Sequence, residues 1–466
     1  MRILILQPMP PKAVEDRPAY VDAVARLGAR LRERGHEPSL MIVREYDEES
    51  LRLKIADVRP ELLVVYLESY YTTLVRRLTE HVAGRHYLPI IVGGPHATVA
   101  PHETLSLIGV EGIVLCEWDR AVPDYLEARR VGPDYINTPG FWFRSEAGIV
   151  RNPIAEPEKP EEMVVVPDRS LYSADQILDG HGRIDILATR GCSFYCAHCQ
   201  QDLAAGLYEE GNMASLRRRP VQALATEVEH LRTTYPAMRG LRFVGCTFPL
   251  DVEYLNRYTE IFCGPMRVPF TARVKTSELT AETAELLRKC GCYELELEVL
   301  SGSDFIRNEI FNLDLSERQI LEAFAACRTA ELKTRALVQV GLPYDTVVTI
   351  EQTGKLVRRA GADAVDVSIY YPLPGTKAHH VCQENGWLSG RGADAFLAGQ
   401  SALDMPGLDA ATIKRYATLL PHLVHNPKAW PALMKLERLH LGKRSLADLV
   451  APLLGQRWGR NRGGHG

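Results

Sequence analysis

Short apolar runs that alternate with amphipathic helical segments constrain the fold of this 466-residue chain more than any other sequence feature. Within residues 1–130, apolar runs at 3–6, 39–43 and 62–67 are separated by segments of helical periodicity such as 20–34. This alternation is typical of βαβ units that build a parallel sheet. We therefore predict an α/β fold in which residues 1–130 form a Rossmann-like domain.

A second alternating series predicts a separate domain over residues 181–380. It contains six strand candidates, which are too few for a complete eight-stranded barrel, so we predict a partial (β/α)6 barrel. The prolines between the two series, from Pro133 to Pro167, predict an irregular connector over 131–180. The pattern after the last strand candidate predicts a helical C-terminal region over 381–466.

Overall charge and hydropathy exclude several classes of partner. The chain has 55 basic and 59 acidic side chains and a net charge of -4, so it lacks the basic excess that is typical of nucleic-acid-binding proteins. No apolar run reaches the roughly 18 residues that cross a bilayer. The polar, proline-rich sequence after residue 6 does not resemble a signal peptide. We therefore expect a cytoplasmic protein with no nucleic-acid or membrane partner.

Three cysteines, Cys192, Cys196 and Cys199, lie close together after a strand candidate at 184–189. Catalytic groups of barrel folds lie at this carboxyl end of the strands. Thiolates suit zinc or iron–sulfur clusters, and a structural zinc site would need His198 as its fourth ligand. A four-iron cluster held by three cysteines instead leaves one iron open to a substrate or cofactor. The cluster is the interpretation that we favour.

The Cys-x3-Cys-x2-Cys spacing, with an aromatic residue before the second cysteine, resembles the signature of the radical S-adenosylmethionine (SAM) superfamily. The resemblance implies that the three cysteines hold a [4Fe-4S] cluster whose open iron binds SAM. One electron from a donor or reductase would then release methionine and a 5'-deoxyadenosyl radical, which abstracts hydrogen from a small-molecule substrate. The SAM-binding residues that the resemblance implies are Tyr195, Arg273, Glu298, Ser301 and Gly341.

Further strings, such as Val-Gly-Gly-Pro-His at 92–96, are similar to the subgroup that carries an N-terminal cobalamin-binding domain, and this likeness extends to about residue 380. Where that family has Gly-Glu-Gly-Glu after the last strand of the domain, this chain has Cys-Glu-Trp-Asp at 116–119. Bulky side chains there, and the aromatic pair Tyr70 and Tyr71, could occupy the place of the corrinoid. We expect the domain fold without a requirement for cobalamin, and whether cobalamin binds stays open.

The segment 293–299 alternates strictly, which places Glu294, Glu296 and Glu298 on one face of a strand. In a barrel covered by helices the apolar face meets the helices, so the carboxylates point inward, and Asp366 of the last strand candidate joins them. Buried carboxylates need cations, which come either from internal salt bridges or from a cationic substrate held by Glu294, Glu296 and Asp366. The candidate internal cations are Arg273 and Lys275.

The acidic interior and the altered cobalamin turn make the chain resemble the radical SAM dehydratases of aminoglycoside antibiotic biosynthesis. We therefore predict radical 1,2-diol dehydration of a small aminosugar-type intermediate, in which Tyr208 or Tyr293 donates a hydrogen atom or a proton. The alternative hypothesis is a cobalamin-dependent radical SAM C-methyltransferase. A third hypothesis is a non-catalytic iron–sulfur or corrinoid-binding sensor.

Overall fold

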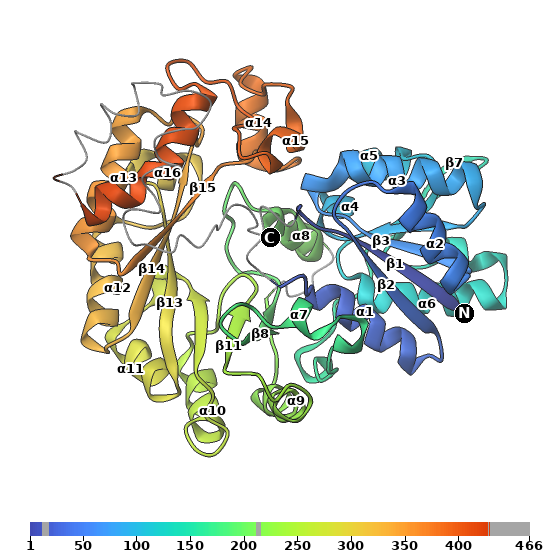
Figure 1. The fold of residues 1–466 in the computed structure, drawn as a ribbon, viewed down its shortest axis with the longest axis horizontal. Coiled ribbons are helices and arrows are strands. Elements are labelled where there is room, and N and C mark those ends of the chain that lie inside the picture. Colours follow the sequence, from blue (N-terminus) through green and yellow to red (C-terminus); the bar gives the residue numbers. More distant parts are fainter. Residues whose placement is uncertain (12–17, 211–215, 427, 429–466) are drawn as a thin grey trace.

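Two largely parallel sheets, each covered by helices, make up most of the protein (Figure 1). The structure is a computed structural model that describes residues 1–11, 18–210, 216–426 and 428. Within these residues no helix is long and apolar enough to cross a membrane. The predicted α/β fold, with a Rossmann-like N-terminal domain and a six-stranded partial barrel, is confirmed. The predicted helical C-terminal region covers residues 381–466. After residue 426, only residue 428 of this region belongs to the described residues.

The N-terminal sheet has seven strands in the order β2-β1-β3-β4-β5-β6-β7, of which β1 to β5 are parallel. Both faces are covered, because Ile3 and Ile5 of β1 are buried on the side of α1 and α6, whereas Leu4 and Leu6 are buried on the side of α2 and α3. The strands are β1 (Arg2–Pro8), β2 (Glu37–Val43), β3 (Leu62–Tyr66), β4 (Ile90–Gly93), β5 (Val110–Val114), β6 (Phe141–Ser145) and β7 (Gly148–Arg151). The helices are α1 (Asp22–Glu33), α2 (Glu48–Val58), α3 (Thr72–Arg85), α4 (Pro95–Val99), α5 (Pro101–Ser106) and α6 (Trp118–Val131).

Residues 131–180, predicted to be an irregular connector, contain regular structure that extends this sheet. The β6–β7 hairpin pairs antiparallel with β5. Phe141 and Phe143 of β6 are buried and stack with ring centroids 5.1 Å apart. The hairpin escaped prediction because Pro139 and Pro153 flank it closely, and proline near a short apolar run indicates a loop.

The second sheet holds the parallel strands β15-β14-β13-β12-β11-β8, so strands that follow one another in sequence are neighbours in space. No strand pairing closes the sheet between β8 and β15 within the described residues. The strands are β8 (Arg183–Leu187), β11 (Gly240–Val244), β12 (Phe270–Val274), β13 (Cys292–Leu300), β14 (Lys333–Val340) and β15 (Ala364–Ile369). The outer helices are α9 (Val221–Thr234), α10 (Val252–Phe262), α11 (Ala281–Lys289), α12 (Glu317–Thr329), α13 (Val347–Ala360) and α16 (Ala410–His425).

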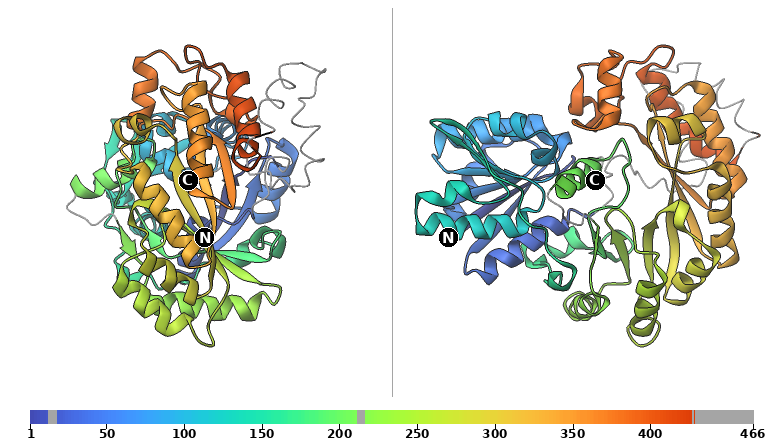
Figure 2. Two further views of the ribbon diagram at one scale, coloured as in Figure 1. Left: turned by 90° about the vertical axis from the view of Figure 1, so that its left-hand side faces the viewer. Right: turned by 180° about the vertical axis from the view of Figure 1, so that it is seen from behind.

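The N-terminal domain lies across the open side of the partial barrel, with α8 (Gln200–Glu210) between the two sheets (Figures 1 and 2). Helix α8 packs against α4, and Gln200 Nε2 donates a hydrogen bond of 2.6 Å to Ser69 Oγ, just after β3. Two further short helices, α14 (Lys377–Glu384) and α15 (Gly392–Leu397), lie above this junction in Figure 1. The carboxyl edge of the N-terminal sheet therefore faces the barrel domain.

An indole ring fills the carboxyl edge of the N-terminal sheet. Trp118, at the start of α6, is 2% exposed and lies against Gly93 at the end of β4. Its Nε1 donates a 3.1 Å hydrogen bond to the Ala23 carbonyl, and its ring lies 5.3 Å from the ring of Tyr66. Because a Cβ atom at Gly93 would lie 2.6 Å from the indole, the glycine is needed here for close packing.

This contact predicts a stability difference between two glycine substitutions. Gly93→Ala should lower the free energy of unfolding by about 1–3 kcal/mol, because the added methyl overlaps the indole. Gly84→Ala in α3 is the control, since nothing lies within 4 Å of its Cβ position, and it should be neutral or stabilising by up to about 1 kcal/mol. Urea unfolding of both variants measures the difference. Equal stability of the two variants would show that Trp118 does not pack on Gly93.

Candidate functional site

The three predicted cluster cysteines lie on one loop between β9 (Thr189–Arg190) and α8, at the carboxyl edge of the barrel. The loop begins at Gly191, whose φ of +74° is a conformation that glycine adopts without strain. Its middle is anchored on both sides, because Ala197 N–H donates to the Phe311 carbonyl and the Ala197 carbonyl accepts from Ala378 N–H. These two backbone hydrogen bonds fix the middle of the cysteine loop to the rest of the domain.

The thiols lie in a buried, charged environment. Lys275 Nζ is 3.9 Å from Cys196 Sγ, and Gln201 N–H donates to Cys199 Sγ at 3.4 Å. Burial raises the pKa of Cys196 to about 12 and that of Cys199 to about 11. A hydrogen bond with Cys246 lowers the pKa of Cys192 to about 7. Metal binding at this loop must therefore displace protons from at least two thiols at neutral pH.

The donor set of the loop suits a cluster better than a single ion. Among the described residues, no group of three or more His, Cys, Asp or Glu side chains converges on one ion position. A four-iron cluster does not require three ligands to converge on one position, because each thiolate binds a different iron. His198, the candidate fourth zinc ligand, instead lies with its Nε2 3.8 Å from Glu298 and its ring 5.2 Å from that of Phe311.

The predicted SAM-binding residues lie near the carboxyl ends of the strands or on the cysteine loop, but their partners differ. Tyr195 is 45% exposed on the loop, and its carbonyl accepts from Asn312 Nδ2. Ser301 is buried, and its carbonyl accepts from Arg307 Nη1 at 2.7 Å. Gly341 has a φ of +75°, and its N–H donates to the buried carboxylate of Asp345. Arg273 and Glu298 belong to the charged interior described next.

The acidic strand faces arginines of the neighbouring strands. Glu294 of β13 accepts from Arg335 Nε of β14 at 3.0 Å, and Arg335 Nη1 also donates to Asp366 of β15 at 3.0 Å. Glu296 accepts from Arg273 Nη2 of β12 at 3.0 Å. Arg335 was missed in the sequence analysis, although the same period-two alternation that selects the glutamates also selects this residue on β14.

Neither tyrosine that was predicted to donate hydrogen lies over this interior. Tyr293 is the second residue of β13, so it lies at the opposite end of the barrel from the cysteine loop, where it is 37% exposed and accepts from Arg183. Tyr208 of α8 is buried against the N-terminal domain, where it forms a hydrogen bond with Cys116 and stacks near the Arg217 guanidinium.

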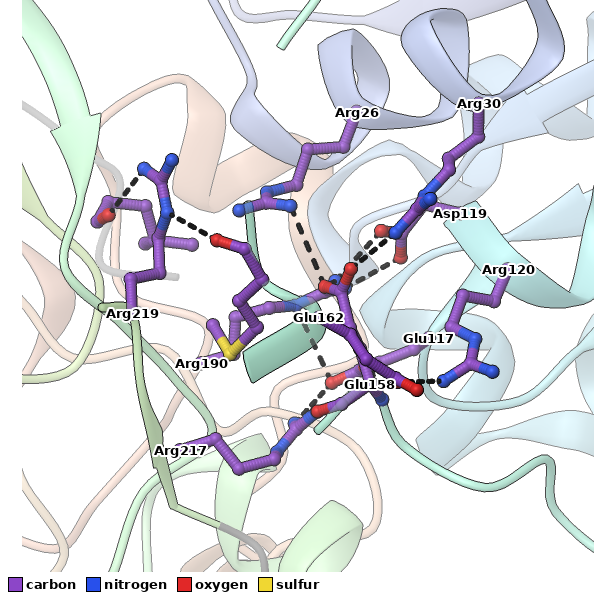
Figure 3. Close-up of polar contacts among 12 residues, drawn as sticks. Arg26, Arg30, Glu117, Asp119, Arg120, Glu158, Glu162, Arg190, Arg217 and Arg219 are labelled. Carbon is purple, nitrogen blue, oxygen red and sulfur yellow. Dashed lines mark hydrogen bonds and ion pairs between the residues drawn. The ribbon is translucent and has the colours of Figure 1, made fainter. Parts of the chain in front are cut away.

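A buried group of arginines and carboxylates joins the cysteine loop to the N-terminal domain (Figure 3). Arg190, two residues before Cys192, donates from both terminal nitrogens to Asp119 at 2.6 and 2.8 Å. It also lies 3.2 Å from Glu158 and 3.5 Å from Glu117. We call this group the domain-joining cluster. Its members are Arg26, Arg30, Glu117, Asp119, Glu158, Arg190 and Arg217.

The domain-joining cluster keeps Asp119 ionised although this side chain is buried. Burial alone would raise the pKa of Asp119, but Arg190 and Arg26 together lower it to about 2. Glu158 has no exposed side-chain surface and faces three arginines, Arg26, Arg30 and Arg190. Such pairs are costly to bury and very costly to break, because loss of one partner leaves an unpaired charge in the interior.

Comparison with known families identifies the barrel. Residues 186–357 match the family model described as the Radical SAM superfamily. These residues are a radical SAM domain. Such a domain implies a [4Fe-4S] cluster and SAM, so the radical SAM domain predicted from the cysteine spacing is confirmed.

Two curated proteins are similar over part of the chain. An uncharacterized methyltransferase of Pyrococcus horikoshii is 23% identical over 62% of this chain and 61% of its own length. A tRNA-2-methylthio-N(6)-dimethylallyladenosine synthase of Chromobacterium violaceum is 29% identical over 43% of this chain and 46% of its own. The chain thus spans about half to three fifths of these relatives.

Two solved structures share the radical SAM domain together with the N-terminal domain. The radical SAM methyltransferase TsrM of Kitasatospora setae, with cobalamin and a [4Fe-4S] cluster bound, has a TM-score of 0.66 at 18% identity and covers 82% of this chain and 78% of its own. The cobalamin-dependent SAM radical enzyme OxsB has a TM-score of 0.68 at 12% identity, with coverage of 97% and 71%. At these identities the likeness shows the fold.

The described side chains at the carboxyl edge of the N-terminal sheet do not fit a corrinoid as they stand. Trp118 already occupies the close approach at Gly93. Tyr70 stacks on Phe396 of α15 at 5.0 Å and lies 5.1 Å from Tyr371, so this edge packs directly on the radical SAM side of the molecule. Tyr71, expected to crowd the same surface, is instead buried in the core of its own domain.

Breaking the domain-joining cluster should destabilise the protein strongly. Arg190→Met leaves Asp119 without its main partner and removes one of the three arginines around Glu158, so the free energy of unfolding should fall by about 3–5 kcal/mol. Arg120→Met is the matched control, because its pair with Glu162 is partly exposed and should contribute less than about 1 kcal/mol. Chemical unfolding followed by circular dichroism measures both. An Arg190→Met variant as stable as the control would contradict the assignment.

Proposed function

We propose that this protein cleaves SAM reductively at a [4Fe-4S] cluster held by Cys192, Cys196 and Cys199 and acts on a small polar substrate in the barrel. The observation that carries the proposal is the anchored cysteine loop at the carboxyl edge of a parallel barrel whose inner face is lined with paired charges. When bound, the cluster supplies the electron that splits SAM into methionine and a 5'-deoxyadenosyl radical. An external electron donor must therefore reach the loop, and we expect the protein to act in the reducing cytoplasm.

The chain's own residues determine which substrates suit the barrel. Arg335 and Arg273 hold Glu294 and Glu296, whereas Glu298 has no arginine partner within 4.0 Å among the described residues. Glu298 is therefore the glutamate that we assign to the substrate or to SAM. Asp366 shares Arg335 with Glu294, and it lies beside Ser368 on the same face of β15. Carboxylates and hydroxyls in this arrangement favour an amine-bearing, hydroxylated molecule.

Methyl transfer is the reaction that the comparisons support. The relative from Pyrococcus horikoshii is named as a methyltransferase, and so is the structural neighbour TsrM. These names back the methyltransferase alternative better than the dehydration expected from the sequence.

Dehydration stays as a second candidate because of one specific observation. Trp118 and Tyr66 fill the edge at which the N-terminal domain could present a corrinoid, and loss of water from a substrate radical needs no corrinoid. Mass spectrometry of products from a panel of amine-bearing polyols separates the candidates, since methyl transfer adds a methyl group and dehydration removes water. A corrinoid-free preparation that forms the dehydrated product would favour the second candidate.

The cysteine loop gives a direct test of the common proposal. Simultaneous replacement of Cys192, Cys196 and Cys199 by Ala should abolish bound iron and the formation of 5'-deoxyadenosine from SAM after reduction. Cys327→Ala is the control, because this thiol is buried in α12 on the outer face of the barrel and should not affect either quantity. A triple variant that still binds about four irons per chain would place the cluster elsewhere.

The filled edge makes a prediction about corrinoid affinity. Trp118→Ala should bind hydroxocobalamin about tenfold or more tightly than the wild type, because the indole must otherwise leave Gly93 at a cost of at least about 1.4 kcal/mol. Trp142→Ala on β6 is the control for loss of an indole, and equilibrium dialysis gives the affinities. Wild-type binding as tight as that of Trp118→Ala would mean that the corrinoid site lies away from this edge.

A further inference from the structure

Lys275 is a buried ammonium in an unusual environment for this charge. It follows β12 at the carboxyl edge of the barrel and is 8% exposed. Its Nζ lies 3.9 Å from Cys196 Sγ and 4.0 Å from the centroid of the Phe194 ring. Both neighbours belong to the cysteine loop, so the lysine faces that loop from the adjoining strand.

No carboxylate of the described residues lies within 4.0 Å of the Lys275 ammonium, and the two glutamates near the same end of β13 have other partners. Glu296 is paired with Arg273 at 3.0 Å. Glu298 lies 3.8 Å from His198. A buried ammonium without an anion is strongly unfavourable, and the face of an aromatic ring compensates only a fraction of that cost.

We propose that Lys275 is the counter-cation of the iron–sulfur cluster and that its charge makes the cluster easier to reduce. The inference rests on the proposed function, since it takes Cys196 as a ligand. Thiolate ligands give the cluster a negative charge, and one-electron reduction adds another. A nearby positive charge stabilises the reduced form more than the oxidised form, and charges around the sulfurs are known determinants of cluster potential.

Other charged groups around the loop do not replace this one. Arg273 has the carboxylate of Glu296 beside it, and His198 is an imidazole that lies with Glu298 and supplies no fixed charge. Arg190 is committed to Asp119 and Glu158 of the domain-joining cluster. Among the cations described around the loop, Lys275 is therefore the one that contacts a thiol and has no carboxylate within 4.0 Å, although its charge also acts on Glu278 from farther away.

The test is an EPR-monitored reductive titration of the anaerobically reconstituted full-length protein. Lys275→Met should make reduction of the cluster less favourable by about tenfold, which corresponds to a midpoint potential about 59 mV more negative for a one-electron couple. Lys275→Arg should keep a potential near that of the wild type. Lys333→Met is the control for the same change of net charge, because Lys333 is 70% exposed at the amino end of β14 and pairs with Asp363.

Each result has a defined meaning. Equal potentials for Lys275→Met and the wild type, with iron content unchanged, would overturn the inference. If Lys275→Met loses its iron, recovery of iron in Lys275→Arg supports the counter-cation, whereas loss of iron in both variants overturns it, because charge would then not be the property required. A wild-type protein that binds the cluster but does not cleave SAM defeats the proposed function and leaves the comparison of potentials intact.

Discussion

The bidentate pair between Arg190 and Asp119 decides where the cysteine loop lies relative to the N-terminal domain. Arg190 is two residues from Cys192, and Asp119 lies in the first turn of α6, which follows the last parallel strand of the N-terminal sheet. Because Glu158, from the segment between the two domains, joins the same pair, three separate parts of the chain must be in place before these charges are compensated. A buried charge that lacks its partner is strongly destabilising, so the position of the cysteine loop is coupled to the folding of both domains.

The barrel interior follows the same physical rule with a different consequence. Its outer face is apolar and packs on helices, whereas arginines on β12 and β14 neutralise the carboxylates of β13 and β15. These ion pairs offset the free-energy cost of burying the carboxylates, so the interior does not depend on a substrate for its counter-charges. Glu298 and Lys275, which have no partner among these arginine–carboxylate pairs, lie at the carboxyl edge beside the cysteine loop.

The N-terminal domain has the fold of the structurally similar cobalamin-dependent enzymes, but side chains of the protein itself occupy its carboxyl edge. Cys116 has a φ of +59°, a conformation that favours glycine, and the residue after Glu117 is a tryptophan that packs on Gly93. A glycine that lets a ligand approach backbone can equally admit a side chain of the protein. The fold of this domain therefore does not establish that it binds cobalamin. The choice between methyl transfer and dehydration depends on whether cobalamin binds.

The sequence by itself determined the fold class, the parallel strands of both sheets and the cysteine loop. The strands and helices follow from local hydrophobic periodicity, and the loop follows from the short spacing of its three cysteines, so neither prediction needs tertiary information. It also selected the glutamates of β13 by their alternation. Tertiary structure alone decided their partners: that Arg335 meets Glu294, that Lys275 faces Cys196, and that Arg190 reaches Asp119. Residues such as Arg190 and Asp119 are 71 positions apart, and no local pattern specifies which buried charges meet, since that depends on how two complete domains pack.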